Sequence, residues 1–305
     1  MDLRQIRYFV ASCEEGSLSA AAERLNCTAS GVSQQMSALE AGLGTSLFER
    51  TRRGVIPTAA GWRFYNRCLA VLKAVSEARM ELEDFSAGLS GSIFAGFAPG
   101  LAKAVLPAAL ARYTGDYPGV DIEIASGTAD ALVAEASGGT LDFYVGQFVS
   151  AQAGLTAAAV GRFPVALLSG SRRGLVPMKP MRLAEVAPLK LVAPSATHSL
   201  RPKIDVAIRN GDIPVERTIS IASLSAQLEF LNLTDWSSIL PFWICLKELG
   251  NEQVTVNPII EPELTVELAL IHPAQRPLSR ASSQLYEYFR QELRRSEEEW
   301  RRIAG

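Results

Sequence analysis

Three short runs of helical periodicity follow one another within residues 1–43, and they restrict the fold of this part of the chain most strongly. The first run places apolar residues at helical spacing: Leu3, Ile6, Val10 and Cys13. Ser17 and Thr28 then stand where helix caps are expected, because a short hydroxyl side chain accepts a hydrogen bond from a free N–H of the first turn. The sequence therefore predicts a head of three helices, the first ending near Gly16.

The third predicted helix has two different faces. Its apolar stripe is spaced four, three and four residues apart: Val32, Met36, Leu39 and Leu43. Small hydrogen-bonding side chains lie opposite: Ser30, Ser33, Gln34 and Ser37. Two short helices joined by a turn, the second with such a face, are typical of a helix-turn-helix that enters the major groove of DNA. A solvated face without a binding role is the alternative, since many globular helices have one.

A basic turn follows this helix and favours nucleic-acid binding. The whole chain has 30 Lys and Arg against 32 Asp and Glu, so a uniformly basic surface is excluded. Residues 48–57, however, predict two short strands around an Arg-Arg-Gly turn. This hairpin concentrates Arg50, Arg52 and Arg53 within four residues. Because phosphate contacts need local cations, this wing is where the DNA backbone is expected to bind.

A long helix is predicted from Thr58, as its cap, to about Ala87. Its apolar residues repeat three and four apart: Tyr65, Cys68, Leu72, Val75, Ala78, Leu82 and Phe85. A helix of about 30 residues extends roughly 45 Å, too far to bury this stripe on a small domain, so pairing with a second copy is expected. Packing against the chain's own second domain is the alternative. Residues 88–91, Gly-Leu-Ser-Gly, predict a flexible joint.

Beyond the joint, strand-like and helical runs alternate, which predicts a parallel α/β sheet in two lobes. The first lobe takes strands at 93–97, 120–124 and 143–146, helices at 101–113 and 128–137, and a returning strand and helix at 264–271 and 278–295. The second lobe takes strands at 165–168, 190–193, 218–221 and 238–240, and helices at 200–209 and 224–231. A ligand cleft is expected between the lobes, beyond the carboxyl ends of the strands.

Catalytic and metal-binding patterns are missing from the sequence. It contains no G-x-S-x-G, H-E-x-x-H or P-loop motif, so no enzymatic activity, catalytic residue or cofactor is expected. Four scattered cysteines without a C-x-x-C pair, and only two histidines, argue against a metal site. The first seven residues lack the apolar segment of a secretory signal, and no apolar stretch approaches the roughly 20 residues of a membrane span. A cytoplasmic protein is therefore expected.

The first 61 residues resemble the LysR-type transcriptional regulators. The resemblance rests on ordered motifs at matching spacing: residues 3–10 (LRQIRYFV), 16–25 (GSLSAAAERL), 32–35 (VSQQ) with 39–40 (LE), 47–50 (LFER) and 57–61 (PTAAG). It implies a winged helix-turn-helix at 1–58, a linker helix for dimerisation at 59–87 and a hinge at 88–91. It also implies a periplasmic-binding-protein-like (type 2) effector domain, with lobe I at 92–163 and 267–305 and lobe II at 164–266.

The resemblance assigns the DNA-binding residues. It places Thr28, Ser30, Ser33 and Gln34 at the DNA end of the recognition helix, with Ser37 on the same face. It places Arg50, Arg52, Arg53 and Pro57 in the wing. A glutamine such as Gln34 can contact adenine through two hydrogen bonds. Where the family commonly shows Ser-Gln-Pro-Ala, this chain has Thr28-Ala29-Ser30-Gly31, so an altered operator preference is expected.

The resemblance also places effector contacts at helix starts that face the cleft. The expected residues are Pro99, Gly100, Thr128, Ser195, His198, Arg201 and Ser223. Helix N-termini favour anions, so a carboxylate effector is expected, and Phe97 and Phe148 nearby favour an aromatic body. His198 and Arg201 are candidates for pairing with the acid; capping of the helix near Ser199, with Arg201 solvated, is the alternative.

The implied partners are promoter DNA, a small-molecule effector, further copies of the chain in a homodimer or homotetramer, and RNA polymerase. The alternative function is a cytoplasmic small-molecule-binding protein without a DNA-binding role. That alternative leaves the first 90 residues, including the basic wing, without an explanation.

Overall fold

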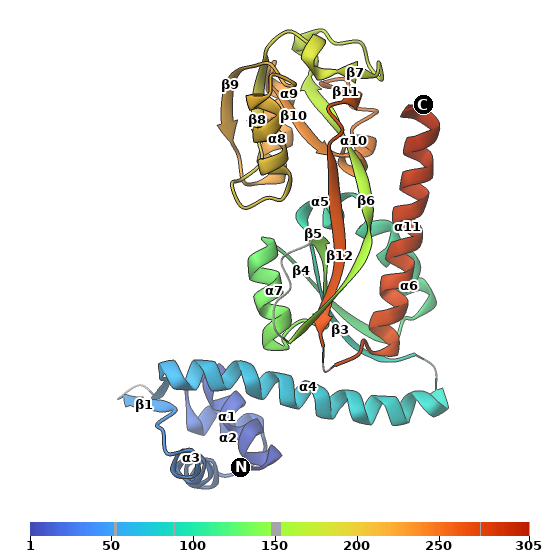
Figure 1. Ribbon diagram of the computed structural model, residues 1–305. Helices are drawn as coiled ribbons and strands as arrows, with labels where there is room; N and C mark the ends of the chain where they lie inside the picture. The colour runs from blue at the N-terminus through green and yellow to red at the C-terminus, as the bar shows by residue number, and fades with distance from the viewer. Residues whose placement is uncertain (52–53, 88, 148–153, 275, 305) are drawn as a thin grey trace. The chain divides into compact units, whose positions relative to one another are not determined.

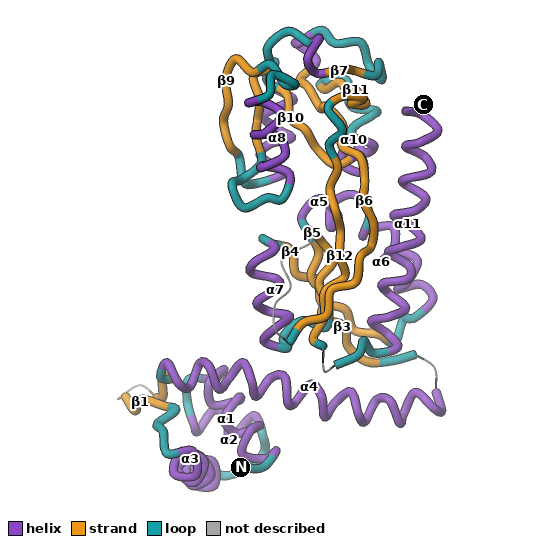
Figure 2. Tube along the Cα trace, in the orientation of Figure 1, coloured by secondary structure: helices purple, strands orange, loops and turns teal. Residues whose placement is uncertain are grey.

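The computed structural model describes residues 1–51, 54–87, 89–147, 154–274 and 276–304 (Figures 1 and 2). These form two compact units. The first comprises residues 1–91 with 134–141, and the second comprises residues 92–133 with 142–305. Within the described residues, none of the helices is both long enough and apolar enough to cross a lipid bilayer.

The head contains the three predicted helices, α1 (Leu3–Glu15), α2 (Leu18–Arg24) and α3 (Ala29–Leu43). Gly16 ends α1 in the left-handed conformation, and Ser17 and Thr28 cap the next two helices as predicted. Val32, Met36 and Leu39 are buried in the head core, in agreement with the predicted stripe. The prediction that Leu43 is buried is wrong, because Leu43 is the last residue of α3, extends past the core and is 41% exposed.

The wing is the predicted hairpin, with β1 (Phe48–Thr51) antiparallel to β2 (Gly54–Pro57). The Glu40 carboxylate fixes its start by accepting hydrogen bonds from the N–H groups of Leu47 and Phe48, at 2.6 and 3.1 Å. Its far strand is tied to the end of α1, because Val55 N–H donates to the Gly16 carbonyl at 2.9 Å. The backbone of α3 and of the wing is therefore held in one head.

The long helix α4 (Ala59–Ala87) has the predicted bounds. Thr58 caps it, since its Oγ1 accepts from Gly61 N–H at 3.0 Å and donates to the Ser46 carbonyl at 2.9 Å. Near its start, Cys68 enters the head core and is 1% exposed. The side chains of the predicted seam at Ala78, Leu82 and Phe85 lie outside the described residues.

The second unit is built on a ten-stranded sheet with the order β4-β3-β5-β12-β6-β10-β8-β9, where β11 pairs with β6 and β7. The strands are β3 (Gly91–Phe97), β4 (Val120–Ser126), β5 (Phe143–Gln147), β6 (Leu155–Gly170), β7 (Met181–Arg182), β8 (Leu189–Ala193), β9 (Val215–Ser220), β10 (Ser237–Pro241), β11 (Val254–Glu261) and β12 (Thr265–Pro273). Neither β7 nor β11 was predicted from the sequence.

The prediction of a purely parallel sheet is wrong. Pairs such as β3 with β5 and β8 with β9 are parallel, but β6 runs antiparallel to β10, β11 and β12. Residues 155–164 of β6 pair with β12, and residues 165–170 pair with β10 and β11. A single 16-residue strand therefore runs through both halves of the sheet, as Figure 1 shows, and its neighbours return along it.

Helices cover the sheet: α5 (Pro99–Ala104), α6 (Leu106–Asp116), α7 (Ala129–Gly138), α8 (Leu200–Arg209), α9 (Leu224–Leu233), α10 (Phe242–Lys247) and α11 (Arg280–Ala304), with 3-10 turns η1 (Ser171–Arg173) and η2 (Leu183–Glu185). The predicted helix at 101–113 is in fact two helices. The break falls just before Pro107, which has no N–H to continue the hydrogen-bond ladder of α5. On α11, Phe289 packs against Phe97, and Ala281 accepts a hydrogen bond from the Tyr113 hydroxyl at 3.0 Å.

Candidate functional site

The first candidate site is the outer face of α3. Thr28, Ser30, Gln34 and Ser37 are exposed there, and Ser33 is half-buried. The Thr28 hydroxyl accepts hydrogen bonds from Gly31 N–H at 3.2 Å and from the Ser30 hydroxyl at 3.4 Å. The five predicted residues thus lie on the first three turns of one helix, where they are accessible to a ligand as large as DNA.

Two neighbouring glutamines show how α3 separates its two faces. The Gln34 side chain is exposed. The Gln35 side chain is half-buried, and its amide oxygen accepts a hydrogen bond from the Gln5 amide of α1 at 3.1 Å. Gln35 therefore joins two helices of the head, whereas Gln34 faces solvent.

The wing is described only in part. Pro57 is half-buried at the end of β2, and the backbone of Arg50 lies in β1 opposite Val55. The side chain of Arg50, and Arg52 and Arg53 as a whole, lie outside the described residues.

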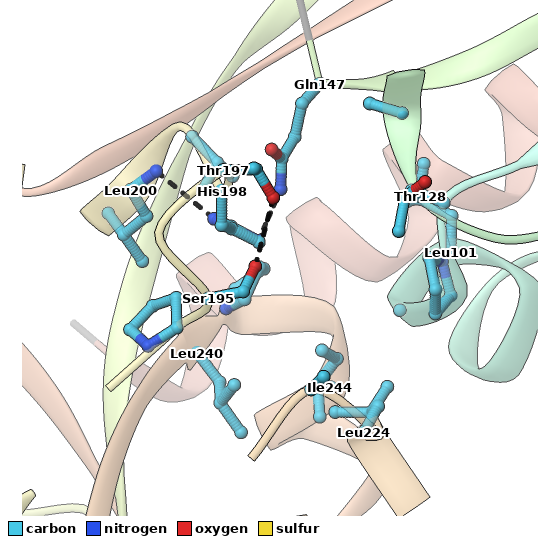
Figure 3. Close-up of a pocket in the computed structure, with 18 of the residues that line it drawn as sticks. Leu101, Thr128, Gln147, Ser195, Thr197, His198, Leu200, Leu224, Leu240 and Ile244 are labelled. Carbon is cyan, nitrogen blue, oxygen red and sulfur yellow. Dashed lines mark hydrogen bonds between the residues drawn. The ribbon is translucent and has the colours of Figure 1, made fainter. Parts of the chain in front are cut away.

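The second candidate site is a pocket of about 190 Å³ inside the second unit (Figure 3). Helices α5, α7, α8, α9 and α10 and strands β5, β10 and β12, together with adjoining loops, contribute to its lining. The structure brings five of the seven predicted effector residues to this pocket: Pro99, Gly100, Thr128, Ser195 and His198.

The other two predicted effector residues do not line the pocket. The Arg201 guanidinium bonds both carboxylate oxygens of Asp205 through Nε, at 2.9 and 3.0 Å, and the Pro194 carbonyl through Nη1, at 3.0 Å. Ser223 caps α9, with its hydroxyl accepting from Ala226 N–H at 3.3 Å. Phe97, expected near the ligand, is buried between Phe143 and Phe289, and Phe148 lies outside the described residues.

Ser199 is the N-cap residue of α8, near the predicted cap, but its hydroxyl makes no capping hydrogen bond, and the side chain of His198 supplies an acceptor at this end of the helix. The His198 Nδ1 accepts a hydrogen bond from Leu200 N–H at 3.2 Å, and its Nε2 faces the side-chain amide of Gln147 (Figure 3). Burial lowers the pKa of His198 to about 4, so the imidazole is neutral at pH 7. The Gln147 oxygen also accepts from Ser199 N–H at 3.0 Å.

Most of the remaining lining is apolar, including Leu101, Leu200, Leu224, Leu240 and Ile244 (Figure 3). The sequence interpretation included Leu200 and Leu224 within its expected ligand-contacting segments, but it missed Leu101, Leu240, Ile244, Gln147 and Trp243, because the elements that carry them lie far apart along the chain. The apolar run at 239–246, which contains Trp243, gave a signal only of burial.

Trp243 is the buried polar group at this site that most needs explanation. It is 3% exposed, and its indole Nε1 has no hydrogen-bond partner among the described residues. The same nitrogen lies 3.3 Å from the point where a Cβ on Gly100 would stand. Gly100 therefore packs closely against the edge of the indole, and a side chain at this position would meet Trp243 and Ile244.

No set of three His, Cys, Asp or Glu side chains placed to hold a metal ion is found in the described part of the chain. Cys13, Cys68 and Cys245 are free thiols that are buried in the way small apolar residues are, and Cys27 is half-buried. Burial raises the pKa of Cys13 and of Cys68 to about 12, so neither thiol is ionised near neutral pH.

A winged helix-turn-helix head followed by a long helix and a two-lobed unit with an internal pocket defines a ligand-responsive DNA-binding regulator. Two family models match the chain. Residues 3–62 match the bacterial regulatory helix-turn-helix protein, lysR family, and residues 86–294 match the LysR substrate binding domain. The chain belongs to the LysR family: it is a DNA-binding transcriptional regulator with an effector-binding domain, and not an enzyme.

Individual relatives agree with this assignment. The nitrogen assimilation regulatory protein nac of Escherichia coli is 26% identical over 280 residues, which cover 92% of this chain and 91% of the relative. Full-length OxyR from Pseudomonas aeruginosa, a substituted form, has the same fold with a TM-score of 0.71 at 20% identity, over 95% of each chain. CbnR in complex with its target DNA has a TM-score of 0.66 at 22% identity, over 96% of this chain and all of that one.

Proposed function

We propose that α3 reads operator DNA in the major groove through Thr28, Ser30, Ser33, Gln34 and Ser37, while Arg50, Arg52, Arg53 and Pro57 place the wing against the sugar-phosphate backbone. The observation that carries the proposal is the row of exposed hydroxyl and amide groups on the first turns of α3. Such groups hydrogen-bond base edges and phosphate oxygens. The three wing arginines supply the local positive charge that phosphate contacts require.

Gln34 is the residue proposed to carry most of the base recognition. An exposed glutamine amide can donate to N7 and accept from N6 of one adenine, which no other base offers in the same arrangement. Ala29, also exposed at the start of α3, has no hydrogen-bonding group. We therefore propose that the operator is selected less strictly at the base that faces Ala29.

The proposed assembly is a dimer through α4, with two dimers joined into a tetramer. Two copies of α3 would then enter major grooves about one helical turn apart on an interrupted palindrome. The effector occupies the pocket of the second unit and shifts an equilibrium between two shapes of the tetramer that bend the promoter differently. The change exposes or covers contacts with RNA polymerase, and the protein acts in the cytoplasm on chromosomal promoters.

The test uses two adjacent glutamines as a matched pair. Gln34→Ala and Gln35→Ala are made in the full chain, and each purified protein is used to select binding sites from random DNA and to titrate the best site. Gln34→Ala is expected to weaken binding about 10- to 100-fold and to lose the preference for one base pair, since a good bidentate contact is worth about 1–3 kcal/mol. Gln35→Ala is expected to keep the base preference, because Gln35 contacts Gln5.

Unchanged sequence selection by Gln34→Ala contradicts the assigned role of Gln34. Loss of binding by both variants in equal measure contradicts the separation of the two faces. If the unmodified chain binds no DNA at low salt, the DNA-reading role itself is refuted.

A further inference from the structure

We propose that the effector of this protein is an uncharged, largely apolar molecule, about the size of a single ring, that carries one hydrogen-bond acceptor for the indole of Trp243. The inference rests on the proposed function in one respect, namely that the pocket of the second unit is the effector site. It replaces the carboxylate expected from the sequence with a different chemical class.

The charges around the pocket do not suit an anion. Among the described lining residues there is no lysine or arginine, and the one formally charged side chain is Asp130, exposed in the first turn of α7. Residues 148–153, which the structure does not describe, contain no lysine or arginine either. Arg201, the nearest cation expected from the sequence, is neutralised by Asp205 and bonded to the Pro194 carbonyl.

The start of α8, one of the helix N-termini that were expected to bind a carboxylate, is occupied from within. At the start of α8, Ser199 N–H donates to the Gln147 side-chain oxygen at 3.0 Å. Leu200 N–H donates to His198 Nδ1 at 3.2 Å, and Arg201 N–H donates to the His198 carbonyl at 2.9 Å. At the start of α5, Pro99 has no N–H at all. An anion at the start of α8 would have to break existing hydrogen bonds to gain new ones.

His198 does not supply the missing positive charge. Its Nδ1 is already an acceptor for a backbone N–H, which a protonated ring could not be. Its burial also disfavours the charged form, so at neutral pH the imidazole presents a neutral edge to the pocket. The imidazole therefore leaves the interior of the pocket without net positive charge.

The size and the walls of the pocket fit an apolar ring. A dry cavity of about 150 Å³ lined by aliphatic and aromatic side chains holds benzene, and this pocket measures about 190 Å³. Aliphatic side chains from α5, α9 and α10 supply much of its wall. Moving a carboxylate from water to such a wall without a cationic partner costs several kcal/mol, whereas an uncharged ring gains free energy by the same transfer.

Trp243 supplies the specific hydrogen bond. Its indole N–H is buried and has no partner among the described residues, a state that is costly for a donor. It lies beside Gly100, whose lack of a Cβ permits this close approach, and both residues line the pocket. A carbonyl, amide or hydroxyl oxygen on the ligand would bond this N–H, whereas a single neutral donor could not compensate for burying a full negative charge.

The test is a panel of one-ring compounds that differ in charge: toluene, benzyl alcohol, benzamide, benzoate and benzylammonium. Binding to the full-length chain is measured by titration calorimetry and by tryptophan fluorescence at pH 7.5. Gly100→Leu is expected to remove the pocket, because even a Cβ there would lie 2.8 Å from Ile244 Cδ1 and a leucine side chain must displace the wall or occupy the cavity. Trp243→Phe keeps an aromatic ring and removes only the indole N–H, and circular dichroism checks that each variant is folded.

The expected result is that benzyl alcohol and benzamide bind at least 10-fold more tightly than benzoate and benzylammonium, and that Gly100→Leu abolishes this binding. Trp243→Phe is expected to weaken benzamide binding about 2- to 10-fold, which corresponds to the loss of one neutral hydrogen bond. The affinity for toluene, which has no acceptor, is expected to stay unchanged. Benzoate binding in the pocket as tightly as benzamide overturns the inference. Failure of every uncharged compound to show binding that Gly100→Leu removes also overturns it.

The same protein preparations separate this inference from the proposed function. The protein could bind the uncharged compounds in the pocket and yet bind no DNA at low salt. That result would support the ligand class and refute the DNA-reading role. A chain that binds operator DNA but selects benzoate keeps the regulatory role and refutes the ligand class.

Discussion

The face of α3 and the effector pocket are built in opposite ways. The proposed DNA contacts come from one continuous helix and its cap, so helical geometry alone decides which side chains share a face. The pocket draws its lining from residues as far apart as Ala98 and Leu268, which meet only when the sheet has formed. Chemistry on the helix face is therefore visible in the sequence, whereas the chemistry of the pocket depends on which groups become partners after folding.

Two glutamines illustrate this difference. Gln34 on α3 is exposed and free to bond an incoming ligand. Gln147 at the end of β5 also lines its site, but its amide is engaged by His198 and by Ser199 N–H. Polar groups at the head are thus available for recognition, while those at the pocket rim stabilise the pocket itself.

The largest effect is expected from Gly54→Ala in the wing, for which Gly42→Ala in α3 is the matched control. A Cβ on Gly54 would lie 2.2 Å from the Gly16 carbonyl, and its φ of 140° disfavours any side chain. Gly54→Ala is expected to destabilise the head by roughly 4 kcal/mol and to abolish DNA binding, through steric overlap and backbone strain together. Urea unfolding and DNA titration measure these effects, and effector binding should persist.

Gly42→Ala is the control for this prediction. Gly42 lies in α3, and its Cβ would meet nothing within 4 Å. The same chemical change is expected there to stabilise the head by about 0.5–1 kcal/mol, because alanine favours helix more than glycine does. Equal effects of the two substitutions would show that the attachment of the wing to Gly16 is unimportant.

Local signals explain why the head could be predicted closely from the sequence. The caps Ser17 and Thr28 and the stripe formed by Val32, Met36 and Leu39 act within a few residues, so periodicity and cap chemistry placed three helices and the wing correctly. Leu43 and Leu3, at opposite ends of the predicted apolar stripes, are 41% and 40% exposed, since helical spacing continues to the last turn whether or not a core lies beneath it.

The second unit could be predicted only in part, for reasons of tertiary structure. Most strands and helices were found, but the antiparallel course of β6 and β12 depends on pairing between residues about 100 positions apart. The same holds for the pocket: the sequence shows that His198 and Arg201 lie close together near the start of α8. It does not show that His198 bonds Leu200 N–H or that Arg201 bonds Asp205. Because these side chains already have partners inside the protein, the expected anion site has no free cation among the described residues.

A smaller effect is expected from acid titration of the pocket rim. The pKa of His198 is about 4 in the folded chain, against an ordinary value near 6.5, because the charged form is disfavoured by burial. Between these two pKa values His198 is protonated in the unfolded chain and neutral in the folded chain. Its site therefore does not lower the free energy of unfolding above about pH 6.5, and that free energy falls as the pH drops towards 4. The loss amounts to roughly 3 kcal/mol for the second unit.

His198→Asn isolates this contribution. The Asn oxygen can accept from Leu200 N–H as Nδ1 does, but it does not titrate. Urea unfolding at pH 7, 6, 5 and 4 should show the wild-type protein losing stability relative to the variant as the pH falls. A difference between the two proteins that stays constant with pH would mean that His198 is not held neutral by its site.

The smallest effect is expected at Arg201, the residue for which sequence resemblance and structure disagree most about its role. Its guanidinium is held by Asp205 and the Pro194 carbonyl, and it does not line the pocket. Arg201→Gln should therefore change the free energy of unfolding by at most about 1 kcal/mol, since the pair with Asp205 is partly exposed. The affinity for an uncharged pocket ligand should stay within twofold of the wild-type value. If Arg201 contacted a carboxylate directly, Arg201→Gln would lower the affinity for that carboxylate tenfold or more.

Titration of benzamide and benzoate against this variant and against Asp205→Asn tells the two roles apart. Asp205→Asn leaves the arginine without its carboxylate partner, and an effector that truly contacts Arg201 would then bind more tightly.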